Sequence, residues 1–520
     1  MSHLLNNPVD SDIALTALVT GPSELPATPS RGRFFVIAAL AVLTIATALR
    51  VYHLGDRSLW FDEALSANMS RSTLSQMLGQ QRSRGSAPVV HPYLLYLIQK
   101  VASGAVAVRT PSVLASLLAV LVMLAMVRAK ISHSAALFAA AILALSASQI
   151  RYAQEVREYS LCVLFAAILM YCVLRWEAAG SRGRYPALLF ALLFFSPLIQ
   201  YGLVFFAFAI LSTIGLRLLL TRNTCFRVSD LIVGSAFLAA GALLSFVLTL
   251  RHQFQPERGH WYLMANYFDP KTMSLLHFLS SNSKGLLSFL IPGQVIACCF
   301  GVCAIIFCII QACSRKYATI TLLFFTSLAI AMCASVVKVY PYGGIRQCLF
   351  LAPVLTLFAG VVFADLLQRL RAPLQSVAVV VFMLLIFFSG YRGMLRQWPY
   401  GEYEDTKTIL KELARLSAPS DQIWVNHDAV EALDFYLRGK DHRFIYGKFH
   451  QDPQKYVPEL LESIDRRDDR LWLVFSHLQQ PSDRVEEQLI VNTLGSGWDV
   501  QCVMAPTNAS LYVARRTKSP

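Results

Sequence analysis

Two adjacent carboxylates, Asp62 and Glu63, directly follow the aromatic pair Trp60 and Phe61, shortly after the first long apolar run of the chain. Acidic side chains are costly to place beside lipid, and they usually face a cavity or a partner. A carboxylate in such a place can accept a proton from an attacking hydroxyl or amine, or can help to hold a cation. The alternative is that the pair begins an interfacial helix over 63–78, because acidic residues suit the positive end of a helix dipole. Residue chemistry alone slightly favours the helix start, since acidic helix starts are common.

A second polar group lies in the short segment 151–159, which contains Gln154, Glu155 and Arg157. An arginine at a membrane edge can extend its charged end to water, but this explains the three side chains together less well. Arginine is suited to binding phosphate through two parallel hydrogen bonds. The segment therefore offers an anion-binding side chain among other polar groups.

Two further positions carry side chains of the same kinds. Arg346, together with Lys338, offers a cation on a later turn, where simple anchoring at the membrane interface is an equally good explanation. His91 precedes Pro92 at the start of an apolar helix, and proline is favourable in a first helical turn. By itself His91 is more typical of a satisfied polar residue than of a ligand.

The composition indicates which elements must position these side chains. Of the 520 residues, 55% are hydrophobic and 15% are charged, and the mean hydropathy is +0.50. Soluble domains are about one quarter charged, so lipid is the main solvent expected here. The net charge of +14 comes from short Arg and Lys clusters between apolar runs, a pattern typical of membrane topology rather than of a nucleic-acid partner. The eleven cysteines lie mostly in apolar runs without metal-ligand spacing, and no disulfide framework is expected.

About eleven apolar runs are long enough to cross a bilayer. They lie near 34–49, 110–127, 134–150, 159–175, 186–201, 203–221, 231–250, 285–311, 318–336, 348–366 and 374–391. The segment 91–107 is apolar but short and interrupted, and we interpret it as an amphipathic helix at the outer interface. With that assignment the basic clusters all face the cytoplasm, together with a disordered tail of residues 1–30.

The predicted fold is an all-α polytopic membrane protein with a small α/β domain at its C-terminal end. The membrane domain covers 31–391, with outward loops at 52–109, 151–158, 251–284 and 337–347. The α/β domain covers 392–520 and is expected on the extracytoplasmic side. Its helices are predicted near 403–416, 429–438, 453–465 and 483–494, and its strands near 422–426, 443–446, 471–475 and 498–515.

Several of these motifs resemble the GT-C superfamily of membrane glycosyltransferases. They are Arg57-x-x-Trp60-x-Asp62-Glu63-Ala64, His91-Pro92, Val108-Arg109-Thr110-Pro111-Ser112 and Ser148-Gln149-x-x-Tyr152-x-Gln154-Glu155-x-Arg157-x-Tyr159. Within the superfamily the chain is most similar to bacterial dolichyl-phosphate-mannose–protein mannosyltransferase-like proteins, a group that includes the lipid A aminoarabinose transferases. The resemblance is strongest over 50–180 and weaker at 342–353. In the C-terminal domain it is architectural only.

The resemblance implies that a hexose or pentose is moved from a polyprenyl-phosphate carrier to a lipid, glycan or protein acceptor. The transfer would take place at the extracytoplasmic face of a bacterial inner membrane, by inverting displacement. Asp62 would activate the acceptor. No cofactor is required, although family members differ in whether a divalent cation participates, and Glu63 is the nearest additional ligand candidate beside Asp62. For the C-terminal domain, a packing lid is favoured over acceptor recognition.

The resemblance also assigns a substrate-binding set. Arg157, Arg346 and Arg57 would stabilise the prenyl-phosphate leaving group. Gln154, Glu155 and His91 would position the sugar or the phosphate, and Tyr342 joins the same set. The chain departs from the family in two places. It has His91-Pro92-Tyr93 where many relatives have His-Pro-Pro, and it lacks the second-loop aspartate that some relatives carry.

Two other classes of protein are compatible with a multi-span chain. A transporter or flippase of lipid-linked sugars predicts charged residues inside spans and pseudo-repeated halves. The mid-span regions are nearly free of charge, and no convincing repeat is found. A non-catalytic envelope-assembly subunit would use the soluble domain as its working part, and the substitution Asp62→Asn would then be harmless.

Overall fold

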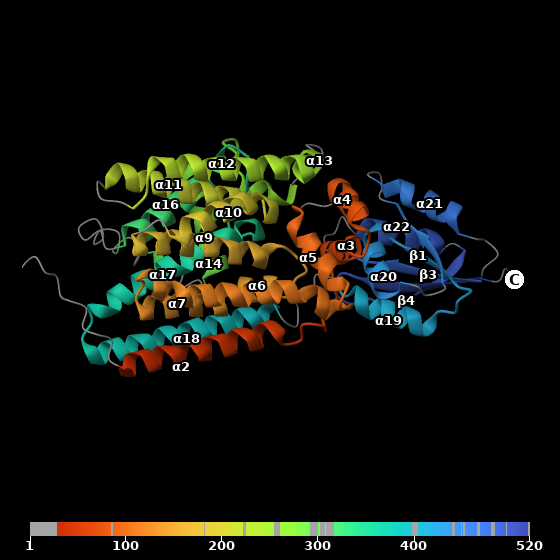
Figure 1. The fold of residues 1–520 in the computed structure, drawn as a ribbon. Helices are drawn as coiled ribbons and strands as arrows, with labels where there is room; N and C mark the ends of the chain where they lie inside the picture. Colours follow the sequence, from red (N-terminus) through yellow and green to blue (C-terminus); the bar gives the residue numbers. More distant parts are fainter. Residues whose placement is uncertain are drawn as a thin grey trace, which may run out of the picture.

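The long apolar runs of the sequence form helices that lie side by side in one bundle (Figure 1). The computed structural model describes residues 29–517 except 85–86, 181–182, 222–224, 254–260, 292–299, 302–306, 308–316, 398–403, 439–441, 449, 451–452, 465–468, 480–483 and 496. The predicted tail 1–30 lies almost wholly outside the described residues. So does most of the predicted span 285–311.

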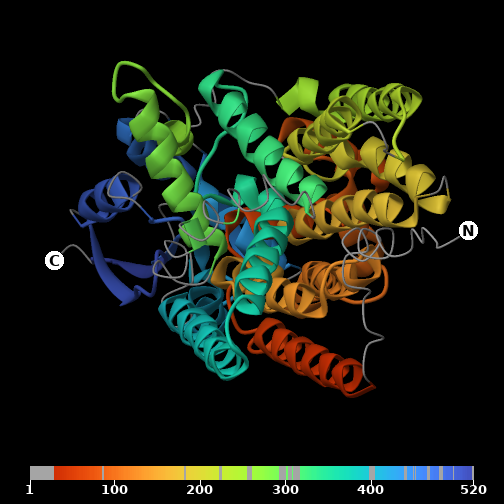
Figure 2. The same ribbon diagram turned by 90° about the vertical axis from the view of Figure 1, so that its left-hand side faces the viewer.

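Within the described residues, eight helices are long and apolar enough to cross a membrane, and one bent pair could make a ninth. The eight are built on α2 (Pro29–Val51), α6 (Ala105–Ala125), α9 (Tyr159–Ala179), α11 (Leu203–Leu220), α12 (Val228–Ser245), α16 (Ala318–Val336), α17 (Ala352–Gln368) and α18 (Ala372–Gln397). The apolar helix α10 (Arg184–Ile199) is shorter. Figure 2 looks along the bundle and shows α17 near its centre, in agreement with the buried side chains of that helix.

The bent pair corresponds to the predicted span 134–150. Helix α7 (His133–Leu145) and helix α8 (Ala147–Ala153) meet at an angle of 61° around Ser146. The buried guanidinium of Arg50 donates to the carbonyl oxygens of Leu143 (3.3 Å) and Ala144 (3.0 Å), so the free carbonyls at the break have a partner. The break directs α8 and the polar segment after it towards the first loop.

The first loop that the sequence predicts to face outward contains more helix than the sequence indicated. The predicted interfacial helix 63–78 is two helices, α3 (Phe61–Met69) and α4 (Leu74–Ser83), because Thr73 caps a new helix start with Gln76. The helix predicted over 91–107 is also shorter in the structure, where it is α5 (Val90–Gln99). Gly104, with a φ of 95°, turns the chain before α6 begins at Ala105, so the end of the predicted loop 52–109 is helical.

The third predicted loop, 251–284, is likewise partly helical. Its described residues form the short helices α13 (Arg251–Gln253) and η3 (Trp261–Asn266) and the start of α14 (Leu275–Leu290). Ser274 caps α14 by accepting from the backbone N–H of His277 at 3.3 Å. In the last turn predicted to face outward, the 3-10 helix η4 (Arg346–Leu351) leads directly into α17. The loops are therefore built from short capped helices.

The C-terminal domain is a five-stranded sheet covered by helices on both faces, which confirms the prediction of a small α/β domain. The strand order is β2 (Arg443–Tyr446), β1 (Gln422–Val425), β3 (Arg470–Phe475), β5 (Ser510–Arg516) and β4 (Trp498–Met504). The first three strands are parallel, whereas β3–β5 and β5–β4 are antiparallel. The helices are α19 (Thr406–Leu416), α20 (Val430–Tyr436), α21 (Tyr456–Ser463) and α22 (Arg484–Leu494).

Alternating side chains of β1 fill the two apolar layers of this domain. Ile423 and Val425 pack in one layer with residues of α19 and α20, and Trp424 packs in the other with residues of α21 and α22. The domain lies at one end of the helix bundle, against α3 and α4 (Figure 1). Phe435 joins an apolar cluster formed mainly by the membrane domain, which includes Leu59 and Val156.

Candidate functional site

The first turn of α3 presents Asp62 and Glu63 to different surroundings. Successive residues of an α-helix point about 100° apart, so two adjacent carboxylates on one turn do not share a partner easily. Glu63 also closes the helix start, because its Oε2 accepts from the backbone N–H of Trp60 at 3.4 Å. The predicted helix start is therefore present, and Glu63 is the residue of the pair that closes it.

Asp62 faces two arginines that come from distant parts of the chain. Its Oδ2 lies 3.4 Å from Nη2 of Arg346 and 3.6 Å from Nη1 of Arg157. The Asp62 side chain is 23% exposed, whereas that of Arg157 is 6% exposed and also pairs with Glu158 at 3.5 Å. Burial alone would lower the pKa of Arg157, but Glu158 and Asp62 outweigh it and raise that pKa well above its usual value. We call Asp62, Arg157, Glu158 and Arg346 the Asp62 cluster.

Aromatic rings border the two guanidinium groups. The guanidinium carbon of Arg346 lies 5.3 Å from the ring centroid of Trp60 and 5.7 Å from that of Tyr159. The guanidinium carbon of Arg157 lies 5.8 Å from the Tyr159 ring. Cation–π contacts of this kind orient a guanidinium without using its N–H donors. The two rings therefore help to hold the Arg346 guanidinium beside Asp62, where it can meet an anion.

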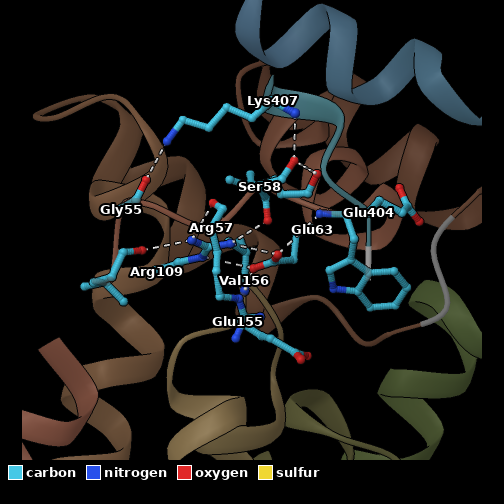
Figure 3. Close-up of polar contacts among 12 residues, drawn as sticks. Gly55, Arg57, Ser58, Glu63, Arg109, Glu155, Val156, Glu404 and Lys407 are labelled. Atoms are coloured by element: carbon cyan, nitrogen blue, oxygen red, sulfur yellow. Dashed lines mark hydrogen bonds and ion pairs between the residues drawn. The ribbon is translucent and has the colours of Figure 1, made fainter. Parts of the chain in front are cut away.

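Glu63 is enclosed in a separate network, which Figure 3 shows. Its carboxylate is bridged by Arg109, with Nε–Oε1 and Nη2–Oε2 distances of 3.2 and 3.0 Å, and both side chains are essentially unexposed. Oε1 also accepts from the backbone N–H of Val156 at 2.7 Å. Arg109 donates further to the carbonyl oxygens of Leu54, Arg57 and Ser58. This Glu63 cluster joins the first loop, α6 and the second loop.

Three other predicted site residues are buried with unused hydrogen-bonding atoms. Among the described residues, Glu155 Oε2, Arg57 Nε and His91 Nε2 have no hydrogen-bond partner, although Glu155 Oε1 accepts from Arg151. Burial raises the pKa of Glu155 and lowers that of Arg57, and burial followed by the charge of Arg157 lowers the pKa of His91 to about 3. Buried polar atoms normally have partners, so these three atoms indicate a place for a polar ligand.

Gln154 and Tyr342 are engaged elsewhere in the structure. Gln154 Nε2 donates to three carbonyl oxygens at and just after the end of α2. They belong to Leu49, Arg50 and Tyr52 and lie at 3.0–3.2 Å. The buried Tyr342 hydroxyl pairs with that of Ser283 at 2.9 Å. In the described part of the chain, these two side chains therefore contribute to helix and loop packing and lie outside the Asp62 cluster.

The two carboxylates proposed as metal ligands do not converge on a shared position. Asp62 is directed to guanidinium groups, and both oxygens of Glu63 are used by Arg109 and backbone N–H groups. In the part of the chain that the structure describes, no group of three or more His, Cys, Asp or Glu side chains is arranged to hold a metal ion. These residues do not fit a divalent cation, and no chemical step is assigned to one.

Sequence reasoning missed three residues that shape this site. Arg109 appeared only as part of a motif, and Glu158 follows Arg157 directly but received no role. Glu404 of the C-terminal domain accepts from the backbone N–H of Phe61 at 3.3 Å, across 343 residues of sequence. The place of Arg109 at the edge of an apolar run was a detectable signal, since a charge in or near a span is usually functional or paired. Glu404 had no such signal.

Comparisons with known proteins identify similar chains. Residues 86–250 match the model of the dolichyl-phosphate-mannose-protein mannosyltransferase family. ArnT from Cupriavidus metallidurans, solved with bound undecaprenyl phosphate, is 15% identical and has a TM-score of 0.57, with coverage of 94% of this chain and 98% of that one. The oligosaccharyltransferase AglB from Archaeoglobus fulgidus, in complex with an inhibitory peptide and dolichol-phosphate, is 10% identical with a TM-score of 0.50 and coverage of 94% and 75%. No curated protein matches the sequence significantly.

Proposed function

The chain has the fold of the GT-C superfamily of membrane glycosyltransferases, which confirms the resemblance drawn from its motifs, and on that premise we propose that it transfers a sugar from a polyprenyl-phosphate carrier to an acceptor. The observation that carries this proposal is the Asp62 cluster. A carboxylate that can take a proton lies beside two arginines that can bind a phosphate. The similar proteins were solved with undecaprenyl phosphate and with dolichol-phosphate, in keeping with a lipid-phosphate donor.

The proposed reaction is a single displacement at the anomeric carbon. Asp62 removes the proton from an acceptor hydroxyl or amine, and the freed lone pair forms the new bond to the anomeric carbon. The bond from that carbon to the phosphate oxygen breaks, and its electron pair remains on the phosphate. Arg157 and Arg346 stabilise the charge that develops there. The configuration of the sugar is inverted.

The shared position of the two arginines implies an order of events. In the structure, one oxygen of Asp62, Oδ2, makes the ion-pair contacts to both Arg157 and Arg346. A donor phosphate would compete with Asp62 for the guanidinium groups of Arg157 and Arg346. Binding of the donor would thus release Asp62 from its ion pairs and leave its carboxylate free to accept the proton of the acceptor. We expect the donor to bind before the acceptor is activated.

The remaining predicted residues take different parts in this proposal. Glu155, Arg57 and His91 would offer their unused atoms to the sugar or the phosphate. Glu63 would hold the loops in place, because its oxygens are committed to Arg109 and backbone groups. Gln154 and Tyr342 would act only through packing, since they bond to α2 and Ser283.

We also propose that the site faces the extracytoplasmic side of a bacterial inner membrane. The support is the clustering of Arg and Lys in alternate connections, which normally remain in the cytoplasm. A reporter enzyme fused after Gly393 should then be active only outside the cytoplasm. Activity of that reporter inside the cytoplasm would contradict the proposed orientation.

The function is tested with Asp62→Asn in the purified, folded protein. The source membranes supply a total lipid extract as the donor and acceptor pool, and release of polyprenyl monophosphate is followed by mass spectrometry. We expect the variant to lose release activity. Asp365→Asn is the matched control, because Asp365 near the end of α17 pairs with Arg369, four residues further on, at 3.1 Å, and this variant should leave the rate unchanged. Release by Asp62→Asn at the wild-type rate would contradict the proposal.

A further inference from the structure

The C-terminal domain holds the backbone that leads into Asp62. Besides the bond from Phe61 to Glu404, the backbone N–H of Leu59 donates to the Tyr436 hydroxyl at 2.8 Å. The backbone N–H of Lys407 donates to the Ser58 hydroxyl at 3.0 Å, and the Lys407 ammonium donates to the carbonyl of Gly55 at 2.8 Å (Figure 3). Three side chains of the C-terminal domain therefore fix one stretch of the first loop.

Glu404 has both carboxylate oxygens committed at this boundary. Oε2 accepts from Phe61, while Oε1 contacts Nδ1 of His477 at 2.5 Å and Nε2 of Gln479 at 3.4 Å. The Glu404 side chain is fully buried. Phe61 is the first residue of α3, and the first N–H groups of a helix have no partner inside the helix. Glu404 thus supplies that partner from another domain.

Asp62 stands between two residues that are held from opposite sides. Phe61 is bonded to Glu404 of the C-terminal domain, and Glu63 is bonded to Arg109 of the membrane domain. With both neighbours fixed, the first turn of α3 has little freedom to rotate. The Asp62 side chain is then directed to Arg157 and Arg346, where it lies in the structure.

We infer that Glu404 is a positioning residue for Asp62, and that the C-terminal domain forms part of the active site through it. This inference rests on the proposed function, because it assumes that Asp62 is the proton acceptor. It assigns the domain a part beyond that of a packing lid. A displacement of about 1 Å in a catalytic group can lower a rate by about 100-fold, so the loss of this single contact has a measurable consequence.

Glu431 provides a matched control for Glu404. It is also a buried glutamate of the C-terminal domain, and it also bonds to α3, accepting from Nδ2 of Asn68 at 3.0 Å. It pairs with Arg84 as well, next to the end of α4. Glu431 therefore contributes to the same interface at the far end of α3, away from Asp62. Its substitution should weaken the interface without moving the first turn.

The experiment compares Glu404→Ala with Glu431→Ala in the full-length protein. Three quantities are measured: polyprenyl monophosphate release at saturating lipid extract, binding of undecaprenyl phosphate in nanodiscs, and Tm. We expect Glu404→Ala to lower the maximal release rate by about 10- to 100-fold while undecaprenyl phosphate binding changes by less than about threefold. Glu431→Ala should lower Tm to a similar extent and keep the rate near the wild-type value.

Two further variants keep the inference testable. Glu404→Gln retains an oxygen acceptor for the Phe61 N–H and should keep the rate within about threefold of wild type. Glu404→Asp retains the charge but withdraws the carboxylate from Phe61; it should show the rate loss even if Glu404→Ala does not fold. A wild-type rate in Glu404→Asp or Glu404→Ala would overturn the inference. So would equal rate losses in Glu404→Ala and Glu431→Ala that follow their Tm values. An active Asp62→Asn would instead overturn the proposed function.

Discussion

The Asp62 and Glu63 clusters start from adjacent residues of one helix turn and differ in almost every physical respect. The Asp62 side chain is 23% exposed, and its contacts to arginine nitrogens are 3.4 and 3.6 Å long. The Glu63 side chain is unexposed, is bridged by Arg109 through both oxygens, and accepts a 2.7 Å bond from a backbone N–H. One cluster is partly open and loosely paired, and the other is closed and saturated.

The difference indicates that two adjacent carboxylates can have different roles. A saturated buried ion pair has no capacity for a ligand, and breaking it leaves an uncompensated charge. A partly exposed carboxylate with long ion-pair contacts can exchange its partners when an anion binds. Glu63 is therefore suited to hold the loops together, and Asp62 is suited to chemistry.

The largest expected effect is a difference in reaction rate between variants of the two carboxylates. Asp62→Asn should lower polyprenyl monophosphate release by about 10²- to 10⁴-fold, the range found for loss of a general base, with little change in Tm. The release rate of Glu63→Gln, calculated per folded molecule, should be higher than that of Asp62→Asn. Equal rate losses per folded molecule in the two variants would remove the distinction between the clusters.

The second expected effect is a difference in folding stability between variants of the same two carboxylates. Glu63→Gln leaves the buried Arg109 without a counter-charge, and loss of one partner of a buried pair typically costs about 3–5 kcal/mol of folding free energy. Asp62→Asn should change the unfolding free energy far less, because Asp62 and Arg346 are partly exposed and the buried Arg157 keeps its pair with Glu158. Denaturant or thermal unfolding in detergent measures both variants. A stable Glu63→Gln protein would show that the closed cluster does not support the fold.

A smaller effect concerns the arginines of the open cluster. Arg346→Ala should weaken undecaprenyl phosphate binding by about 10- to 100-fold, because hydrogen bonds to charged groups contribute about 1.5–3 kcal/mol. Arg369→Ala is the control, since that arginine is exposed and pairs locally with Asp365. Asp62→Asn should bind undecaprenyl phosphate more tightly than wild type, because the competing carboxylate is gone. Weaker binding by Asp62→Asn would argue against the exchange of partners.

The smallest expected effect, taken over one pH unit, is the pH dependence of stability that comes from His91. The pKa of this buried imidazole is lowered from 6.5 to about 3, so the folded protein keeps it neutral while the unfolded chain binds a proton below about pH 6.5. The contribution of His91 to the free energy of unfolding is therefore complete above pH 6.5. It decreases towards pH 3, by at most about 1.4 kcal/mol per pH unit. His91→Asn should flatten the profile of Tm against pH in this window. An unchanged slope would show that other groups determine it.

Local sequence patterns predicted most of the elements that the structure describes. Apolar runs of span length predicted the membrane helices, and alternating apolar strands predicted the C-terminal sheet. Errors occurred where a single capping residue or glycine decided the result, as at Thr73 and Gly104. Such a residue shifts an element boundary without changing the hydrophobic pattern that the prediction used.

Motif reasoning located Asp62, Arg157 and Arg346 as candidates, but the sequence by itself could not tell the role of one carboxylate from that of its neighbour. The partners that distinguish them are distant: Arg109 lies 46 residues from Glu63, and Arg346 lies 284 residues from Asp62. Glu404, 343 residues from Phe61, belongs to a domain that folds around its own sheet. Periodicity and caps act within a few residues, so they determine helices and strands. Which buried charge meets which partner depends on how those elements dock, and only the tertiary structure decided that.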